Sequence, residues 1–397
     1  MTSSVIVLSH RPGEWLAPCL ESVARQADEV LLVDNGSPGG QAATIGSAAG
    51  VTVVASATNT GFAGGVNLGL GHARGDIVAL LNDDAVAGPR WLAAATEVLD
   101  DPTVAAVTPK VRLSGWWREV VLDDPEWHAP GDARPLGRQV RTVTVAGRDV
   151  LAAVAGAGIH QLEADPATPG RRWRWTAGAR PWYVPLPDPA GAGEVRIDGA
   201  PAPASPVCRL VNNAGSFLRS DGYLGDHGLE APDDGRFDDP GERFSASGTA
   251  LVARAATFGR LGGLAGPYFA YYEDSDWSWR ARLGGMRLVY DPRATVEHRR
   301  SATSGGVADP WVRRLGERNR LLTAVRNAPM RVAADLVTGR IRGGPDQGIL
   351  RAVLARLPWA AATRVQLSRH WTLRPEAVWE RWAGADVDWD ASPCRPG

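Results

Sequence analysis

The stretch Ile77-Val78-Ala79-Leu80-Leu81-Asn82-Asp83-Asp84-Ala85 joins a short apolar run directly to two adjacent carboxylates. The run does not alternate apolar and polar residues, which predicts a strand buried on both faces of a parallel sheet. Ligands of such sheets bind beyond the carboxyl ends of the strands. Acidic side chains at that place are oxygen ligands for a hard divalent cation, which is suited to hold a phosphorylated substrate. The stretch therefore favours an enzyme that handles a nucleotide diphosphate.

Strand and helix signals alternate on both sides of this stretch over the first hundred residues. Apolar residues recur at helical spacing over 15–24 and 91–99. These helices separate short apolar runs, and that alternation predicts an α/β protein with a layered sheet. The other runs that predict strands lie at residues 5–8, 30–33, 51–54 and 104–107.

Polar clusters follow four of the predicted strands at the point where each strand ends. Loops are polar in most proteins, which is the simpler explanation of any one cluster. Four clusters at the same edge of one sheet instead indicate a binding crevice. The clusters are Ser9-His10-Arg11, Asp34, Asn59 with the glycine-rich residues 60–65, and Asn82-Asp83-Asp84.

The composition and pattern of the sequence change twice in the later part of the chain. We expect residues 1–113 to form the first half of the main domain. Frequent Pro, Gly, Arg and Trp over 114–211 predict an inserted β-rich subdomain, whose tryptophans either stack on sugars or fill a small core. The α/β pattern returns over 212–329, with a strand at 242–251 and a helix at 268–282. Residues 330–397 predict a helical extension.

Composition excludes several classes of protein. The net charge of −1 over 397 residues argues against a general nucleic-acid binder. Three widely spaced cysteines fit a reducing cytoplasm rather than a disulfide framework. We see no signal peptide and no apolar run long enough to span a bilayer. A basic helix near the C-terminus leaves peripheral membrane contact open beside a solvated packing helix. The sequence does not indicate an oligomeric state.

Nucleotide-binding motifs of two common kinds are missing. Asp34 stands where a ribose-binding acid would follow a second strand, but the first turn contains no G-x-G-x-x-G. The glycine-rich residues 60–65 lack the Lys-Ser/Thr of a P-loop. These glycines let the backbone approach a nucleotide or simply allow tight turns.

A second acidic cluster and a histidine complete the candidate set. Glu273, Asp274 and Asp276 lie among aromatic residues at the start of a predicted helix. Such acids are often only favourable charges at a helix N-terminus, but like charges in a partly dry cleft raise one another's pKa. A carboxylate of that kind can accept a proton from an attacking hydroxyl. His298 ends a short strand, and imidazole with carboxylate suits Mn²⁺ or a similar ion.

The order of these motifs resembles that of family 2 inverting glycosyltransferases with the GT-A fold, in the rhamnosyltransferase-like branch. The resemblance covers roughly residues 4–110 and 211–328. It implies a Rossmann-like mixed sheet flanked by helices, with the 114–211 segment outside the shared core. The matching segments are residues 5–8, 33–37, 59–69, 75–85, 269–276, 297–298 and 318–321.

The resemblance also implies roles for individual residues. Asp84 looks like the metal-binding member of a D-x-D motif that reads Asn82-Asp83-Asp84 here, and His298 looks like the later metal ligand. Asp274 matches the catalytic base, with Glu273 beside it and Asp276 as a second candidate. The residues implied in binding the nucleotide sugar are Asp34, Asn59, Gly61, Asn67, Asn82, Asp83, Arg318 and Asn319.

The expected function follows from these roles. A divalent ion, Mg²⁺ or Mn²⁺, would bridge a nucleotide-diphosphate sugar to the protein, and a sugar would pass with inversion to an acceptor hydroxyl. The branch makes dTDP-rhamnose a first guess for the donor, and the acceptor is a glycan, a glycolipid or a natural product. Two alternatives stay open: a nucleotidyltransferase, and a catalytically silent protein that binds sugar nucleotides or carbohydrate.

Overall fold

The computed structural model describes residues 1–132, 134–165, 167–168, 170–188, 194–299, 310–342 and 347–384. Contacts within the chain divide it into two compact units, which we describe separately. The sheet unit comprises Met1–Val111, Asn213–His227 and Phe237–Val387. The β-rich unit comprises Arg112–Asn212 and Gly228–Arg236.

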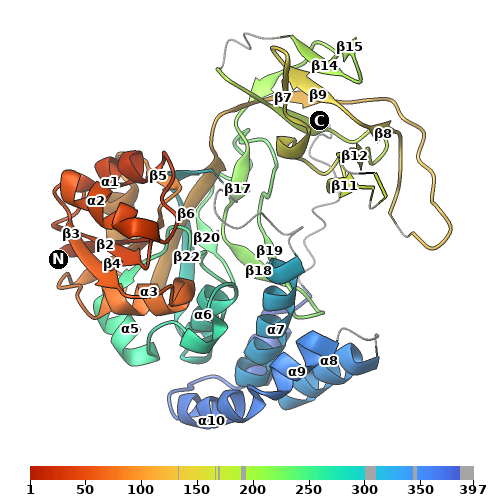
Figure 1. Ribbon diagram of the computed structural model, residues 1–397. Helices are drawn as coiled ribbons and strands as arrows, with labels where there is room; N and C mark the ends of the chain where they lie inside the picture. Colours follow the sequence, from red (N-terminus) through yellow and green to blue (C-terminus); the bar gives the residue numbers. More distant parts are fainter. Residues whose placement is uncertain are drawn as a thin grey trace. The chain divides into compact units, whose positions relative to one another are not determined.

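Four parallel strands form one half of the large sheet of the sheet unit (Figure 1). Their order in space is β4-β1-β2-β3, so the first strand lies inside the sheet. The apolar run at residues 77–81 lies in strand β4, which is buried along its length, as predicted, except for the half-buried Asn82 at its end. The strands are β1 (Ser3–Ser9), β2 (Glu29–Asn35), β3 (Thr52–Ser56) and β4 (Ile77–Asn82).

Helices cover both faces of these strands, because successive side chains of a strand point to opposite faces. Val5 and Val7 of β1 belong to one core cluster with α1 and α4. Ile6 belongs to a second cluster with α3, α5 and α6. The helices are α1 (Leu16–Ala24), α2 (Gln41–Ala48), α3 (Gly61–Leu70), α4 (Trp91–Val98), α5 (Ala255–Leu261) and α6 (Glu273–Leu283).

The other half of the sheet contains antiparallel pairs, which makes the sheet mixed. Strand β21 pairs antiparallel with both β4 and β6, and β22 pairs antiparallel with β5 and β20. The predicted α/β fold class with a mixed sheet is thus confirmed. These strands are β5 (Ala85–Ala87), β6 (Val104–Leu113), β20 (Gly241–Glu242), β21 (Val252–Arg254) and β22 (Arg287–His298), and shorter ones are β17 (Val211–Asn213), β18 (Ser216–Leu218) and β19 (Leu224–Asp226).

Two predicted elements were wrong in part. Of the strand expected at 242–251, only Glu242 lies in a strand, β20, and Gly248 lies in a turn that Asp274 holds by accepting its N–H. The helix expected at 268–282 begins only at Glu273. The backbone before it is left-handed at Phe269, Tyr271 and Tyr272, which a right-handed helix excludes.

The β-rich unit consists of small antiparallel sheets around a core of its own. Trp182 is fully buried in that core, whereas 44% of Trp127 is exposed, so the tryptophans of this unit do not share one environment. The strands are β7 (Trp116–Val120), β8 (Gln139–Val140), β9 (Val143–Val145), β10 (Arg148–Asp149), β11 (Glu163–Ala164), β12 (Arg172–Trp175), β13 (Trp182–Leu186), β14 (Val195–Ile197), β15 (Ala200–Pro201) and β16 (Val207–Cys208).

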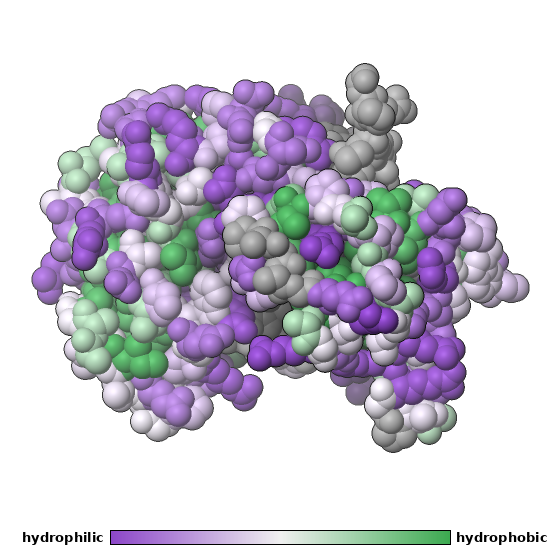
Figure 2. Space-filling view, turned by 90° about the horizontal axis from the view of Figure 1, so that it is seen from above, coloured by the Kyte–Doolittle hydropathy of each residue, from purple (hydrophilic) through white to green (hydrophobic). Residues whose placement is uncertain are grey.

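Helices form the C-terminal part of the sheet unit, as expected (Figure 1). None of the helices in the described part of the chain is long and apolar enough to cross a bilayer. The face seen in Figure 2 is largely hydrophilic, with hydrophobic residues in separate smaller areas. The helices are α7 (Pro310–Asn327), α8 (Met330–Arg342), α9 (Gln347–Leu354), α10 (Leu357–Ser368) and α11 (Pro375–Trp382).

Candidate active site

The polar clusters at the strand ends lie side by side at one edge of the sheet. The register places Ser9 of β1 opposite Asp34 of β2, and Leu8 opposite Asn82 of β4. The hydroxyl of Ser9 donates a 2.6 Å hydrogen bond to Oδ2 of Asp83. Burial raises the pKa of Asp83 to about 6. The carboxyl edge predicted from the sequence is therefore a real cluster of polar groups.

Asp84 and His298 meet at this edge although 213 residues separate them in the chain. Strand β22 pairs with β5, and the register places His298 opposite Ala85. Nε2 of His298 lies 3.1 Å from Oδ1 of Asp84, and both residues are almost fully buried. The N–H of Arg299 also donates to the carbonyl of Asp84, which fixes the strand ends together.

This pair fits a divalent cation by the chemistry of its donors. A carboxylate oxygen and an imidazole nitrogen are ligands that Mn²⁺ accepts. Among the described residues there is no group of three His, Cys, Asp or Glu side chains placed to hold a metal. Mg²⁺ and similar ions bind through one or two carboxylates together with substrate phosphates and water. The pair therefore fits an ion that arrives with a phosphorylated ligand.

Asp274 belongs to the same edge through the turn at Gly248. The carboxylate of Asp274 accepts the N–H of Gly248 at 2.7 Å and that of Ser275 at 2.6 Å. The carbonyl of Thr249 in turn accepts the N–H of Asn82 at 2.9 Å. Burial raises the pKa of Asp274, whereas these hydrogen bonds lower it. The carboxylate is thus held by backbone groups, half-buried, beside the end of β4.

A strained turn precedes Asp274. Phe269, Tyr271 and Tyr272 have φ values of +69°, +68° and +70°, in the left-handed region that residues with a side chain seldom adopt. Each such residue costs of order 1–3 kcal/mol and persists only where neighbouring groups enforce it. Strain of this kind is often found at functional sites.

Two neighbouring residues of α7 hold this turn. Nδ2 of Asn319 donates to the carbonyls of residues 268, 270 and 271 at 3.1, 2.8 and 2.7 Å. Nη2 of Arg318 donates to the carbonyl of Tyr268 at 2.7 Å, and burial lowers the pKa of Arg318 to about 10. Both residues thus contact the turn, and their predicted contact with the nucleotide sugar stays a prediction.

The other two acids of the cluster have different surroundings. Asp276 is fully buried, and its Oδ2 lies 3.0 Å from Arg280 and 3.1 Å from Arg326. Nδ2 of Asn327 donates to its Oδ1 at 2.8 Å. Glu273 is also buried, and burial followed by the charge of Asp274 raises its pKa well above the ordinary value. Of the three acids, Asp274 is the one that is neither fully buried nor ion-paired with a described arginine.

Replacing Asp276 by Asn is expected to lower the free energy of unfolding by about 3 kcal/mol, because two buried guanidinium groups lose their counter-ion. Chemical denaturation followed by tryptophan fluorescence measures the loss. A variant with wild-type stability but no turnover would instead assign the chemistry to Asp276.

The glycine-rich segment 59–65, which contains the first residues of α3, is fixed to the end of β2 and to the strained turn. Asn35 donates to Oδ1 of Asn59 at 3.1 Å and to the carbonyl of Gly61 at 3.0 Å. Gly61 has a φ of +73°, and an added Cβ would lie 2.3 Å from the carbonyl oxygen of Phe269. Only glycine therefore fits at this contact. Asn59 itself is exposed at the rim.

Two other predicted residues bond mainly to the backbone. Asp34 is buried, and its carboxylate accepts the N–H groups of Ser37 and Ala43 at 2.7 and 3.2 Å. The amide of Asn67 exchanges two 2.8 Å hydrogen bonds with the backbone of Leu264. Both side chains fix loops, and their contact with a nucleotide stays a prediction.

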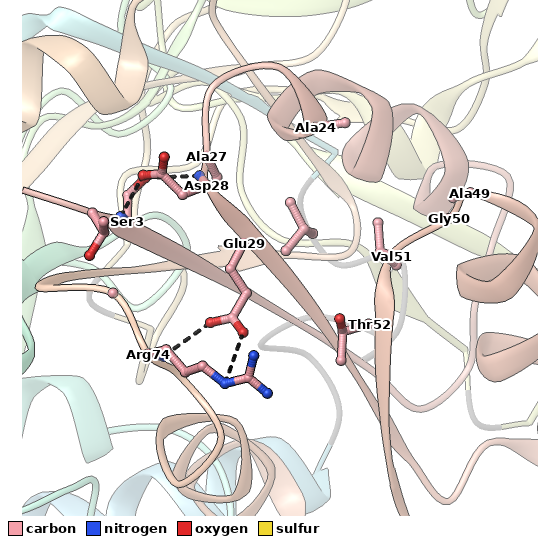
Figure 3. Close-up of a pocket in the computed structure, with 13 residues that line it drawn as sticks. Ser3, Ala24, Ala27, Asp28, Glu29, Ala49, Gly50, Val51, Thr52 and Arg74 are labelled. Carbon is pink, nitrogen blue, oxygen red and sulfur yellow. Dashed lines mark hydrogen bonds and ion pairs between the residues drawn. The ribbon is translucent and has the colours of Figure 1, made fainter.

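A cavity of about 580 Å³ lies at the opposite edge of the parallel strands. Figure 3 shows Ser3 bonded to Asp28, and Glu29 paired with Arg74 across this cavity. Ser3, Asp28 and Glu29 lie at or before the amino ends of β1 and β2. The cavity is thus remote from the carboxyl edge that bears Asp84, and we do not assign the candidate site to it.

Sequence reasoning missed residues that shape the site through the backbone. Asn35 follows Asp34 as the last residue of β2, and its hydrogen bonds to Asn59 and Gly61 were not expected. Gly248 lies in the small-residue run Ser247-Gly248-Thr249 inside a predicted strand. Glycine interrupts the pattern of the predicted strand at this position, and that was the one signal of a turn there.

The comparisons with known proteins agree with this geometry. The description "Glycosyl transferase family 2" belongs to the family model that matches residues 4–141. The match includes Asp34 and Asp84 and ends before Asp274 and His298. A comparison with curated proteins gave no match.

Solved structures match the chain at low sequence identity. The crystal structure of GalNAc-T7 with UDP, GalNAc and Mn²⁺ matches with a TM-score of 0.52 at 13% identity and covers 94% of this chain. The chain spans 58% of the length of that structure. The mannosyltransferase PcManGT from Pyrobaculum calidifontis, in complex with GDP-Man and Mn²⁺, has a TM-score of 0.41 and 16% identity over 96% of this chain and 78% of its own. The chain accordingly has the GT-A fold, and its residues 4–141 match glycosyl transferase family 2.

Proposed function

We propose that the protein is a metal-dependent inverting glycosyltransferase, which moves a sugar from a nucleotide-diphosphate donor to an acceptor hydroxyl. The observation that carries the proposal is the pairing of Asp84 with His298, 3.1 Å apart, at the strand edge to which Asp274 is tied. The family match over residues 4–141 and the GT-A fold support it.

Each residue of the site has a separate task in this reaction. Asp84 and His298 would hold a divalent ion, which when bound offsets the charge that develops on the departing nucleoside diphosphate. Asp274 accepts the proton of the acceptor hydroxyl as its oxygen attacks the anomeric carbon. The attack comes from the face opposite the phosphate, so the new C–O bond forms as the old one breaks. One displacement inverts the configuration of that carbon.

Backbone groups keep Asp274 in place during proton transfer. The N–H groups of Gly248 and Ser275 hold the carboxylate. Hydrogen bonds from Arg318 and Asn319 fix the turn before it. A base whose position is set before substrate binds spends no energy on reorganisation in the transition state.

A panel of nucleotide sugars tests the proposal. We expect one donor, with dTDP-rhamnose tried first, to release nucleoside diphosphate in Mn²⁺ or Mg²⁺ and to stop in excess chelator. The anomeric configuration of the product, read by proton NMR, should be opposite to that of the donor. Binding of nucleotide sugars without turnover of any of them, across acceptors, would favour the silent binding protein instead. Release of pyrophosphate from a nucleoside triphosphate would favour the nucleotidyltransferase.

Turnover should also depend on pH in a defined direction. Because burial raises the pKa of Asp274, the base is still partly protonated above the usual aspartate pKa of about 3.9. Protonated Asp274 cannot accept a proton, so kcat should fall as the pH drops, with an apparent pKa above the ordinary aspartate value. A pH profile of kcat at saturating metal measures this limb. A kcat that stays flat down to the pH where the chain unfolds would contradict the assignment of Asp274 as the base.

A further inference from the structure

We infer that Trp311 forms an acceptor subsite, a platform on which a pyranose ring of the acceptor packs by its apolar face. The inference rests on the proposed function, because only a glycosyltransferase has an acceptor to bind at this place. Trp311 lies in the first turn of α7, the helix whose Arg318 and Asn319 hold the turn before Asp274.

The exposure of Trp311 departs from the pattern of its own helix. Residues spaced by four, seven, eight and eleven positions along a helix share a face. On that face Leu315, Arg318, Asn319 and Leu322 are all buried. Trp311 continues the same face, yet 53% of it is exposed. A large aromatic side chain is thus presented to solvent at the end of a packed stripe.

One aromatic contact and the close packing around Gly61 and Gly248 connect Trp311 to the surroundings of Asp274. The ring of Trp311 stands edge-on to that of Phe269, with centroids 6.0 Å apart and an angle of 88°. Phe269 packs over Gly61, and a Cβ at Gly61 would lie 2.6 Å from its ring. The next residue, Phe62, and the carboxylate of Asp274 would each lie 3.3 Å from a Cβ at Gly248. We call Phe62, Phe269 and Trp311 the aromatic rim.

The aromatic rim points to the acceptor rather than to the nucleotide. Asp274 accepts the proton of the acceptor hydroxyl, so the acceptor lies on the side of this carboxylate. The edge-on contact fixes the Trp311 ring, and a fixed aromatic ring gives a large apolar area at little entropic cost. Pyranoses carry C–H groups on one face and hydroxyls around the edge, so one face packs on such a ring. The subsite therefore suits a glycan or glycoside better than a purely aliphatic acceptor.

Saturation-transfer NMR with a set of methyl and p-nitrophenyl pyranosides tests the inference without requiring turnover. We expect the wild-type chain to bind members of the set and Trp311→Ala to bind them roughly tenfold more weakly. Trp311→Phe should restore most of the binding. The matched control is Trp127→Ala in the β-rich unit, a tryptophan of similar exposure at 44%, which should bind as the wild type does.

Kinetics separate a failure of the inference from a failure of the proposed function. In Trp311→Ala, kcat/KM for a pyranoside acceptor should fall about tenfold more than the rate of hydrolysis of the nucleotide sugar without acceptor. Metal-dependent hydrolysis by the wild type tests the proposed function alone. Four results would each overturn the subsite. The wild type binds no pyranoside, Trp311→Ala binds as well as the wild type, only Trp127→Ala loses binding, or the KM of the donor rises instead.

Discussion

Asp274→Asn is expected to lower kcat by on the order of 10²–10⁴-fold, the usual cost of losing a general base. The amide cannot accept the proton of the acceptor hydroxyl. Its shape is close to that of the carboxylate, and its oxygen can keep one of the backbone hydrogen bonds. The KM for the nucleotide sugar should therefore stay within a few-fold, because the proposed donor site at Asp84 and His298 is left intact. Initial rates of nucleoside diphosphate release measure both constants.

The control for this variant is Asp335→Asn, which removes an equal charge from an exposed position on α8. It should keep wild-type kinetics. Near-normal turnover by Asp274→Asn would remove this residue from the chemistry and reopen the choice among the three acids. A variant that loses activity together with its folding midpoint would have to be replaced by Asp274→Ser, judged at equal stability.

Asp84→Ala is expected to lower kcat/KM by roughly 10³-fold at a fixed Mn²⁺ concentration, because a bound metal supplies several kcal/mol of charge stabilisation. His298→Ala should act in the same direction and less strongly, since a neutral imidazole contributes less to binding a cation than a carboxylate does. Metal titrations of the initial rate measure the effect as a higher concentration of Mn²⁺ at half-maximal activity.

The two ligand variants also have an internal control. Because the pair shares one ion, removing both residues should cost little more than removing Asp84 alone. Additive losses would mean that the two residues act in separate ways. An unchanged metal dependence in His298→Ala would show that the histidine is only a structural neighbour of Asp84.

The parallel half of the fold and its polar edge could be predicted from the sequence. The run at 77–81 has no alternation, and a strand of that kind needs apolar cover on both faces, which α1, α4 and α3 supply. Parallel strands share one carboxyl edge, so Ser9, Asp34 and Asn82 had to lie together. Local pattern and sheet geometry were sufficient there.

The closing of the site could not be predicted in the same way. The contact of Asp84 with His298 depends on the pairing of β5 with β22, and no local sequence pattern predicts that pairing. The sequence around the strained turn at Phe269, Tyr271 and Tyr272 looks helical. The chain forms a turn there instead, because its carbonyls accept hydrogen bonds from Asn319, a residue about fifty positions later. Long-range hydrogen bonds override local propensity at these places.

The resemblance supplied roles that the packing of the chain refines. Asp274 was the first candidate for the base by motif and Asp276 the second, and the structure differs between them in the two buried arginines beside Asp276. Arg318 and Asn319 were assigned to the nucleotide sugar, and the structure shows them bonded to the turn that precedes Asp274. In both cases the structure shows which group each buried hydrogen-bond donor contacts, and the sequence does not.

Electron paramagnetic resonance of Mn²⁺, titrated into the protein with the nucleoside diphosphate that the donor panel identifies, tests the division of labour at this site. We predict that Asp274→Asn binds the ion as tightly as the wild type, although it does not turn over. The Asp84→Ala/His298→Ala double variant should lose the bound-ion signal. Equal Mn²⁺ binding by all three proteins, or a loss of binding in Asp274→Asn, would contradict a metal held by Asp84 and His298 next to a separate base.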